Sequence, residues 1–146
     1  MKGLVIAMAV LWLWSFDVSQ ASAARSHEIP PVRMLHLTSG VEEVWANGEL
    51  VQRASLRLFT SFTAYKKIDS ASRLPRDGVL VRIPFMPPVV IDNTSFSGQV
   101  IQLVVVIPEE KKPWVLLKDV EGSWYECEMS SSVDELLLVL SGAVPN

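Results

Sequence analysis

Few side chains in this sequence can do acid–base, nucleophilic or metal chemistry. The 146 residues contain two histidines, His27 and His36, and one cysteine, Cys127. A Ser-His-Asp or Cys-His arrangement would need one of these histidines, and no G-x-S-x-G elbow, phosphate-binding glycine loop or zinc-type spacing accompanies them. We therefore expect no catalytic site and no cofactor, and we predict that the protein is not an enzyme.

Cys127 is expected to be an inert thiol in the core. It alternates with Tyr125 and Met129 on one side of a predicted strand, and a nucleophilic cysteine needs an activating base and partial exposure. A single cysteine cannot form an internal disulfide. In an oxidising compartment such a thiol is safe only when it is buried, so the pattern predicts burial.

The other side of the same strand carries a candidate ligand-binding surface. Trp124, Glu126 and Glu128 share that side, and an exposed aromatic ring there would stack on a sugar ring. The alternative is a core tryptophan beside two solvated glutamates, since most tryptophans in a domain of this size lie in the core or at its corners.

A second candidate ligand site depends on how the N-terminus is processed. A cut after Ala24 would start the mature chain with Arg25, Ser26 and His27. A histidine in third position joins the α-amine and two backbone amides in a square plane of nitrogens, which suits Cu(II) or Ni(II). A cut after Ala23 puts the histidine fourth and removes the motif.

Asn93 begins an Asn-Thr-Ser sequence in a predicted turn. This sequence is an acceptor for N-glycosylation if the chain passes through a eukaryotic secretory pathway. Otherwise Asn93 is a turn residue whose side chain bonds to the backbone.

The first 23 residues have the features of a secretory signal peptide. A short positive region at Lys2 precedes an apolar run over residues 3–16, and 16 of the 23 residues are hydrophobic. The run is too short to cross about 30 Å of hydrocarbon at ~1.5 Å per residue. Ala21 and Ala23 supply the small residues that signal peptidase needs, so we predict cleavage after Ala23, or after Ala24. The alternative is an uncleaved amphipathic anchor or a buried helix.

Processing would leave one domain without a membrane span. The predicted organisation is a signal peptide over 1–23, an extended arm over 24–31 and a single domain over 32–146. We expect the protein to be secreted, or periplasmic if its source is a Gram-negative bacterium.

The charges are unevenly distributed along the chain. The net charge of −3 gives no general attraction for nucleic acid. Residues 50–90 contain seven basic and two acidic side chains, whereas residues 119–135 contain six acidic and no basic ones. Complementary charge can guide two surfaces together, within the fold or between subunits, although isolated exposed pairs contribute only ~0–1 kcal/mol. The candidate partner surfaces are a basic set, Arg53, Arg57, Lys66 and Lys67, and an acidic set, Glu121, Glu126, Glu128 and Asp134.

The elements that would position these residues are mostly strands. Runs rich in Val, Ile, Thr and aromatic residues are bounded by Pro, Gly, Asn and Asp, and Asn47-Gly48 is typical of a hairpin turn. The predicted strands include residues 56–65, 79–83, 100–107, 114–118 and 124–129, and the prolines at 84, 87 and 88 indicate a sheet edge or a crossing between sheets. Seven or eight short strands favour an antiparallel β-sandwich, immunoglobulin-like or transthyretin-like, after the N-terminal signal-peptide helix.

Two segments fit either type of element. Residues 132–135 have the spacing of a helix capping box, yet we favour a final core strand over 135–141, because five apolar residues cannot be assigned by periodicity. Residues 40–54 suit a hairpin or a helix.

The expected function is binding. The sequence favours an exported, non-catalytic β module that acts in protein–protein interaction or as an accessory or structural subunit of an envelope or secreted assembly. The alternative is a ligand-binding module for a carbohydrate or a metal ion.

Overall fold

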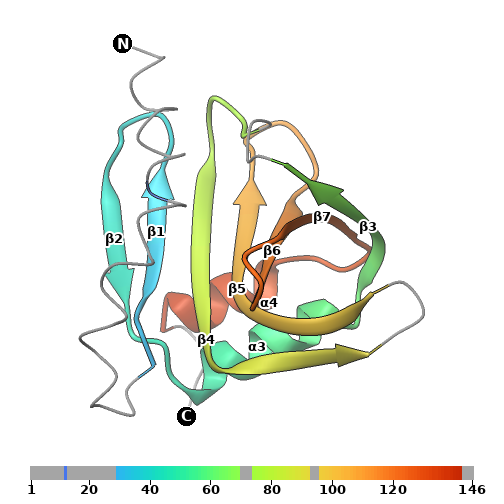
Figure 1. The fold of residues 1–146 in the computed structure, drawn as a ribbon. Helices are drawn as coiled ribbons and strands as arrows, with labels where there is room; N and C mark the ends of the chain where they lie inside the picture. Colours follow the sequence, from blue (N-terminus) through green and yellow to red (C-terminus); the bar gives the residue numbers. More distant parts are fainter. Residues whose placement is uncertain (1–11, 13–28, 70–73, 93–95, 143–146) are drawn as a thin grey trace.

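The fold is one antiparallel sheet of seven strands with two short helices against it (Figure 1). The computed structural model describes residues 12, 29–69, 74–92 and 96–142. The strands are β1 (Val32–His36), β2 (Glu42–Trp45), β3 (Phe62–Ile68), β4 (Val79–Asp92), β5 (Ser97–Ile107), β6 (Trp114–Asp119) and β7 (Trp124–Met129), and the helices are α3 (Glu49–Phe59) and α4 (Asp134–Leu140). The strands lie in the order β2-β1-β4-β5-β6-β7-β3.

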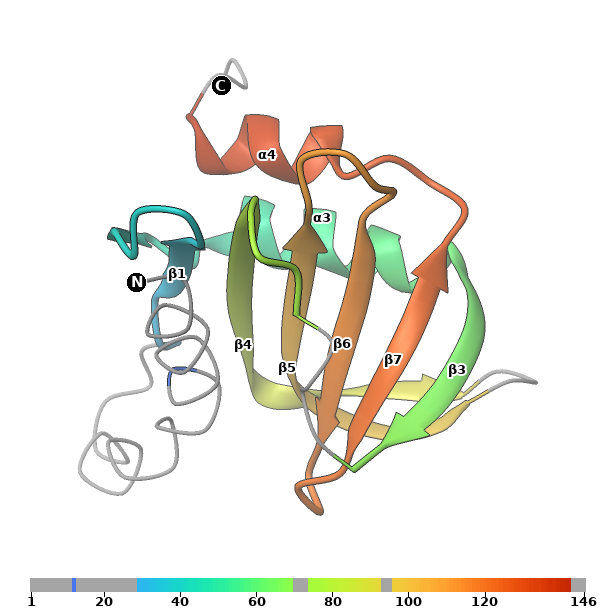
Figure 2. The same ribbon diagram turned by 90° about the horizontal axis from the view of Figure 1, so that it is seen from above.

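The mainly β, antiparallel character predicted from the sequence is confirmed, since every described ladder is antiparallel. A second sheet, which a sandwich requires, is not found among the residues that the structure describes. Helices α3 and α4 form the second layer instead, and they pack beside each other on one side of the sheet (Figure 2).

Of the two structures left open for residues 40–54, the hairpin at Asn47-Gly48 is wrong and the helix is found, because α3 begins at Glu49. It runs through the residues that the strand over 56–65 would have used first. Gly48 is the residue that precedes the helix, with φ −85° rather than the positive φ of a hairpin turn. The Asn47 amide instead donates to the carbonyl oxygens of Pro30 and Pro84 at 2.9 and 3.0 Å. Val51 and Leu58 are buried with helical spacing. The packing of these two side chains and the hydrogen bonds of Asn47 therefore select the helix.

The preferred strand over 135–141 is also wrong, because these residues form α4. Leu136 and Leu140 are buried while Leu138 is 52% exposed. A strand would place all three side chains on one face, whereas a helix separates the middle one from the others. The helix ends at Leu140, and Gly142 follows the C-cap residue Ser141 with a φ of +70°, which suits a glycine.

Strand β4 passes its prolines without leaving the sheet. Residues 79–82 pair with β1 on one side and β5 on the other, whereas Pro84 and the residues after it pair with β5 alone, with a register shift between Pro84 and Val89. Proline has no backbone N–H and cannot donate to a ladder. Beyond Pro84, β4 has a paired strand on one side only, so a backbone donor is not needed on its other side. The bent end of this hairpin brings the Phe96 ring within 5.2 Å of Tyr65 and 4.9 Å of Tyr125, measured between ring centroids.

The sheet has two buried faces. The helix-covered face packs against α3 and α4 through residues that include Val81, Ile83, Leu103, Val105, Leu117 and Cys127. The outer face carries Leu35, Leu37, Leu80, Val104, Val106, Leu116 and Trp124. Val104 and Val105 are neighbours on β5 and both are 0% exposed, so this strand, which the apolar run over residues 100–107 predicts, is buried on both sides. The predicted burial of Cys127 is confirmed as well.

In the described part of the chain, no helix combines the length and the apolar character needed to cross a membrane.

Candidate functional site

The outer face is covered in part by Trp12, which comes from the predicted signal peptide. Trp12 packs into the buried cluster that contains Leu35, Leu80 and Val104, and its own side chain is nearly buried. Strands β1, β4, β5, β6 and β7 supply the other buried members of this cluster, except Leu37, which directly follows β1. The described helices both lie on the opposite face, so the outer face has a different kind of cover.

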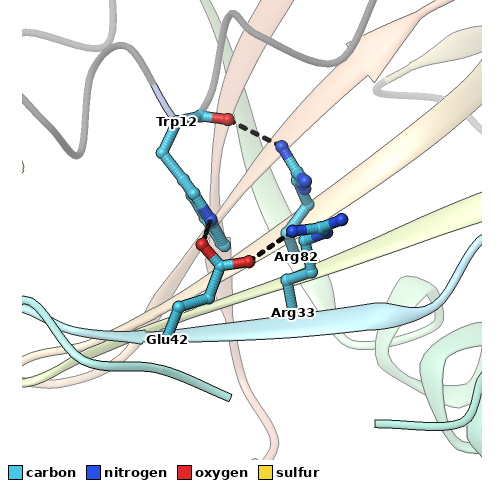
Figure 3. Close-up of polar contacts among 4 residues, drawn as sticks. All are labelled: Trp12, Arg33, Glu42 and Arg82. Carbon is cyan, nitrogen blue, oxygen red and sulfur yellow. Dashed lines mark hydrogen bonds and ion pairs between the residues drawn. The ribbon is translucent and has the colours of Figure 1, made fainter. Parts of the chain in front are cut away.

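Two side chains, Glu42 and Arg82, hold Trp12 on the sheet through three contacts (Figure 3). The indole Nε1–H donates to Glu42 Oε2 at 3.0 Å, and Arg82 Nη1 donates to the main-chain carbonyl oxygen of Trp12 at 2.6 Å. The guanidinium carbon of Arg82 also lies 4.5 Å from the centroid of the Trp12 ring, which is a cation–π contact. The face of the ring, its N–H and its backbone are each recognised by the sheet.

The sheet register brings the recognising residues together. Arg33 on β1 lies opposite Arg82 on β4, and Glu42 on β2 lies opposite Leu35 on β1. Arg33 Nη1 is 2.5 Å from Glu42 Oε1, so this ion pair orients the carboxylate whose other oxygen accepts the indole proton. These three side chains, Arg33, Glu42 and Arg82, form what we call the tryptophan subsite.

Arg82 is an unusual residue for the middle of a sheet, because it is only 3% exposed. Burial and the nearby charge of Arg33 lower its pKa from 12.5 to about 10, while Glu42 acts in the opposite direction. The guanidinium therefore stays protonated at neutral pH. A buried cation needs compensating contacts, and Trp12 supplies an aromatic face and a carbonyl oxygen.

Other polar groups lie on the outer face beside this subsite. Gln102 on β5 pairs with Lys118 on β6, which pairs with Trp124 on β7. The Lys118 ammonium lies 5.8 Å from the centroid of the Trp124 ring. The amide of Gln102 and the Nε1 atom of Trp124 are buried without a hydrogen-bond partner among the described residues. Unsatisfied buried polar atoms are uncommon and cost about 1–3 kcal/mol each.

The structure places Trp124, Glu126 and Glu128 on the same side of β7, as alternation predicts, facing Lys118, Leu116 and Trp114 of β6 respectively. Trp124 is 3% exposed, however, and belongs to the outer-face cluster. Its ring is closed off from a sugar in this structure, while Glu128 is exposed and Glu126 half-buried.

The remaining chemical candidates are not assembled into a site. Burial raises the pKa of Cys127 to about 12, with a further contribution from Glu126, so the thiol is not a nucleophile at neutral pH. His36 Nε2 lies 2.9 Å from Glu43 Oε1, and within the described residues no group of three or more His, Cys, Asp or Glu side chains could hold a metal ion. Four sequence-predicted site residues, Arg25, Ser26, His27 and Asn93, lie outside the described residues.

The basic and acidic segments meet partly within the fold. Strand pairing sets Lys66 on β3 opposite Glu126 on β7, and Arg57 on α3 forms an ion pair with Glu135 on α4. Some of the basic and acidic side chains therefore face each other within one chain.

The tryptophan subsite could not be found from the sequence pattern. Arg82 interrupts an apolar strand, which is a visible signal, but Arg33 and Glu42 look like ordinary surface charges. Trp12 lies in a segment whose composition indicates export. The residues around it carry no pattern that predicts a contact with the sheet.

Comparison with protein families, curated proteins and solved structures gives no match for this chain.

Proposed function

We propose that the protein is an exported, non-catalytic module that binds another protein through the outer face of its sheet. The observation that carries this proposal is the contact between Trp12 and the outer face. If the predicted signal peptide is removed, its tryptophan leaves with it, and apolar strand residues that include Leu35 and Leu80 lose this cover.

An uncovered apolar patch of this kind favours association. Contiguous exposed apolar patches above a few hundred Å² mark interaction sites in soluble proteins. The outer face adds polar groups that can give specificity, since Arg82, Gln102 and Lys118 stand among its apolar residues. A mixture of apolar area with a few placed polar groups is typical of recognition surfaces.

A protein partner fits this surface better than a small ligand. The apolar residues extend from Leu35 on β1 to Trp124 on β7, across five adjacent strands, and a surface that spans several strands matches the footprint of a protein interface. The burial of Cys127 supports a non-catalytic role.

The first test of this proposal is the N-terminus of the exported protein. We expect intact-mass measurement to show a chain that begins at Ala24 or Arg25. A protein that retains Trp12 after export would contradict the proposal, because its outer face would stay covered.

The second test is the location of the binding surface. Arg33 and Arg53 are both partly exposed arginines paired with a glutamate, but Arg33 borders the outer face and Arg53 lies on α3. For a partner that co-purifies with the tagged protein from its native extracellular or envelope fraction, Arg33→Glu should abolish recovery and Arg53→Glu should leave it unchanged. Equal recovery with both variants, each verified by its thermal unfolding curve, would contradict the outer face as the binding surface.

A further inference from the structure

The contacts of Trp12 define what kind of side chain the outer face recognises. Stacking over the Arg82 guanidinium requires an aromatic ring. The hydrogen bond to Glu42 requires an N–H donor on the edge of that ring. Phenylalanine satisfies the first condition and not the second, and leucine satisfies neither, so among the large apolar side chains these contacts select tryptophan.

The groups that make these contacts belong to the domain and not to the leader. Arg33, Glu42 and Arg82 are on hydrogen-bonded strands β1, β2 and β4. The ion pair between Arg33 and Glu42 joins two of them directly. The subsite is therefore pre-organised, and a ligand that replaces Trp12 has little ordering of the protein to offset.

Departure of Trp12 leaves this subsite in need of a new aromatic group. The Arg82 side chain loses the ring beside its guanidinium and the carbonyl oxygen that accepts from Nη1, and Glu42 loses the indole proton. Water can hydrate the charged groups, but it cannot cover apolar neighbours such as Leu35 and Leu80.

We propose that the tryptophan subsite binds a tryptophan-bearing segment of a partner protein in the way it binds Trp12, with the ring on Arg82 and the indole N–H on Glu42. This inference rests on the proposed function and names the chemistry of its partner. The leader tryptophan then acts as an internal mimic that occupies the subsite before processing.

Synthetic peptides test this inference directly. The probe is residues 8–17 of this chain with added lysines for solubility, titrated by calorimetry into the exported protein whose mature N-terminus has been verified by mass. We expect Trp12→Phe in the peptide to weaken binding about tenfold, which corresponds to about 1.4 kcal/mol, and Trp12→Ala to weaken it further.

Variants of the protein locate the bound peptide. Glu42→Gln should weaken binding of the parent peptide. It should have little effect on binding of the Trp12→Phe peptide, because that peptide has no indole proton to donate. Glu43→Gln is the matched control, since Glu43 neighbours Glu42 in β2 but contacts His36. It should leave both affinities unchanged.

Two results would overturn the inference. Equal binding of the parent, Trp12→Phe and Trp12→Ala peptides would show a face that takes apolar segments without selecting tryptophan. Absence of binding by every peptide would show that the subsite does not capture tryptophan from outside the chain. Either result would leave the Arg33→Glu test of the outer face intact, so failure of the inference and failure of the proposed function are distinguishable.

Discussion

The helix-covered face and the outer face of the sheet are built from alternate residues of the same strands, yet they are closed by different parts of the chain. On the helix-covered face, α3 and α4 contribute Leu58, Phe59, Leu136 and Leu140 to the largest apolar cluster. On the outer face, Trp12 joins a smaller cluster with Trp124, and Arg82 and Lys118 are buried nearby.

A buried residue is therefore not always a permanent part of the core. The helix-covered face is closed by residues of the predicted mature domain, so processing does not alter it. The outer face is closed in part by a residue that the predicted cleavage removes. A buried charge such as Arg82 is costly in a permanent core, but it is useful on a surface that exchanges one occupant for another.

The largest expected effect comes from matched leucine truncations on the two faces. Leu103→Ala on the helix-covered face should lower the free energy of unfolding by about 2–5 kcal/mol, whether or not the leader is present. Leu116→Ala on the outer face should cost about 2–3 kcal/mol in the full chain and about 1 kcal/mol or less after the leader is removed. Urea unfolding of both forms measures these values. An undiminished loss for Leu116→Ala in the processed protein would contradict the difference between the faces.

The next effect concerns pH and the helix-covered face. The pKa of Cys127 is raised from 9.0 to about 12 in the folded protein, so folding favours the protonated thiol. Its contribution is fully present below about pH 9 and is lost as the pH rises toward 12, at up to about 1.4 kcal/mol per pH unit. The unfolding free energy of the parent should therefore fall more steeply over this range than that of Cys127→Ala. The difference in slope should persist after leader removal. Parallel curves of unfolding free energy against pH for the parent and Cys127→Ala would contradict the burial of this thiol.

A smaller effect should come from the hydrogen bond between Trp12 and Glu42 in the full chain. Trp12→Phe and Glu42→Gln should show a coupling of about 1–2 kcal/mol in a double-mutant cycle of unfolding free energies, because the bond joins an N–H to a partly buried carboxylate. The control cycle pairs Trp12→Phe with Glu43→Gln and should give a coupling near zero. Equal couplings in the two cycles would remove Glu42 from the tryptophan subsite.

The smallest effect should come from the ion pair between Arg57 and Glu135 on the helix-covered side. Both side chains are more than half exposed, so the coupling from Arg57→Ala and Glu135→Ala should be about 0–1 kcal/mol and should decrease in high salt. A value well above this range would mean that charge, rather than apolar packing, joins α3 to α4.

The central strands could be predicted from the sequence because alternation and continuous apolar runs report directly on side-chain burial. The run over residues 100–107 and the strand Trp124–Met129 are found where the pattern puts them. The two helices were named only as alternatives, for a different reason. Asn47-Gly48 and residues 135–141 are short segments whose local preferences fit two structures, and contacts with Pro84 and with the sheet decide between them.

The candidate site was the least predictable part of the molecule. Its contacts join Trp12 to residues 30 and 70 positions away, and no periodicity links such distant positions. Alternation along β4 places the charge of Arg82 on the opposite side of the strand from Val81 and Ile83. What lies over that side depends on a segment whose composition indicates export. The sequence also left open an uncleaved anchor or a buried helix, and of this segment the structure describes Trp12 alone, which is buried on the sheet.

The most direct measurement compares two neighbouring positions on β5. Val104→Cys reports on the outer face and Val105→Cys on the helix-covered face, each in a Cys127→Ala background, in a full chain with a site-specific protease sequence inserted after Ala24. Both thiols are predicted to react slowly with a maleimide in the intact, folded chain. After cleavage and removal of the leader, the thiol at position 104 should react at least tenfold faster while the thiol at position 105 stays protected. A position 104 that remains as protected as position 105 would contradict the claim that Trp12 covers part of the outer face and leaves it on cleavage.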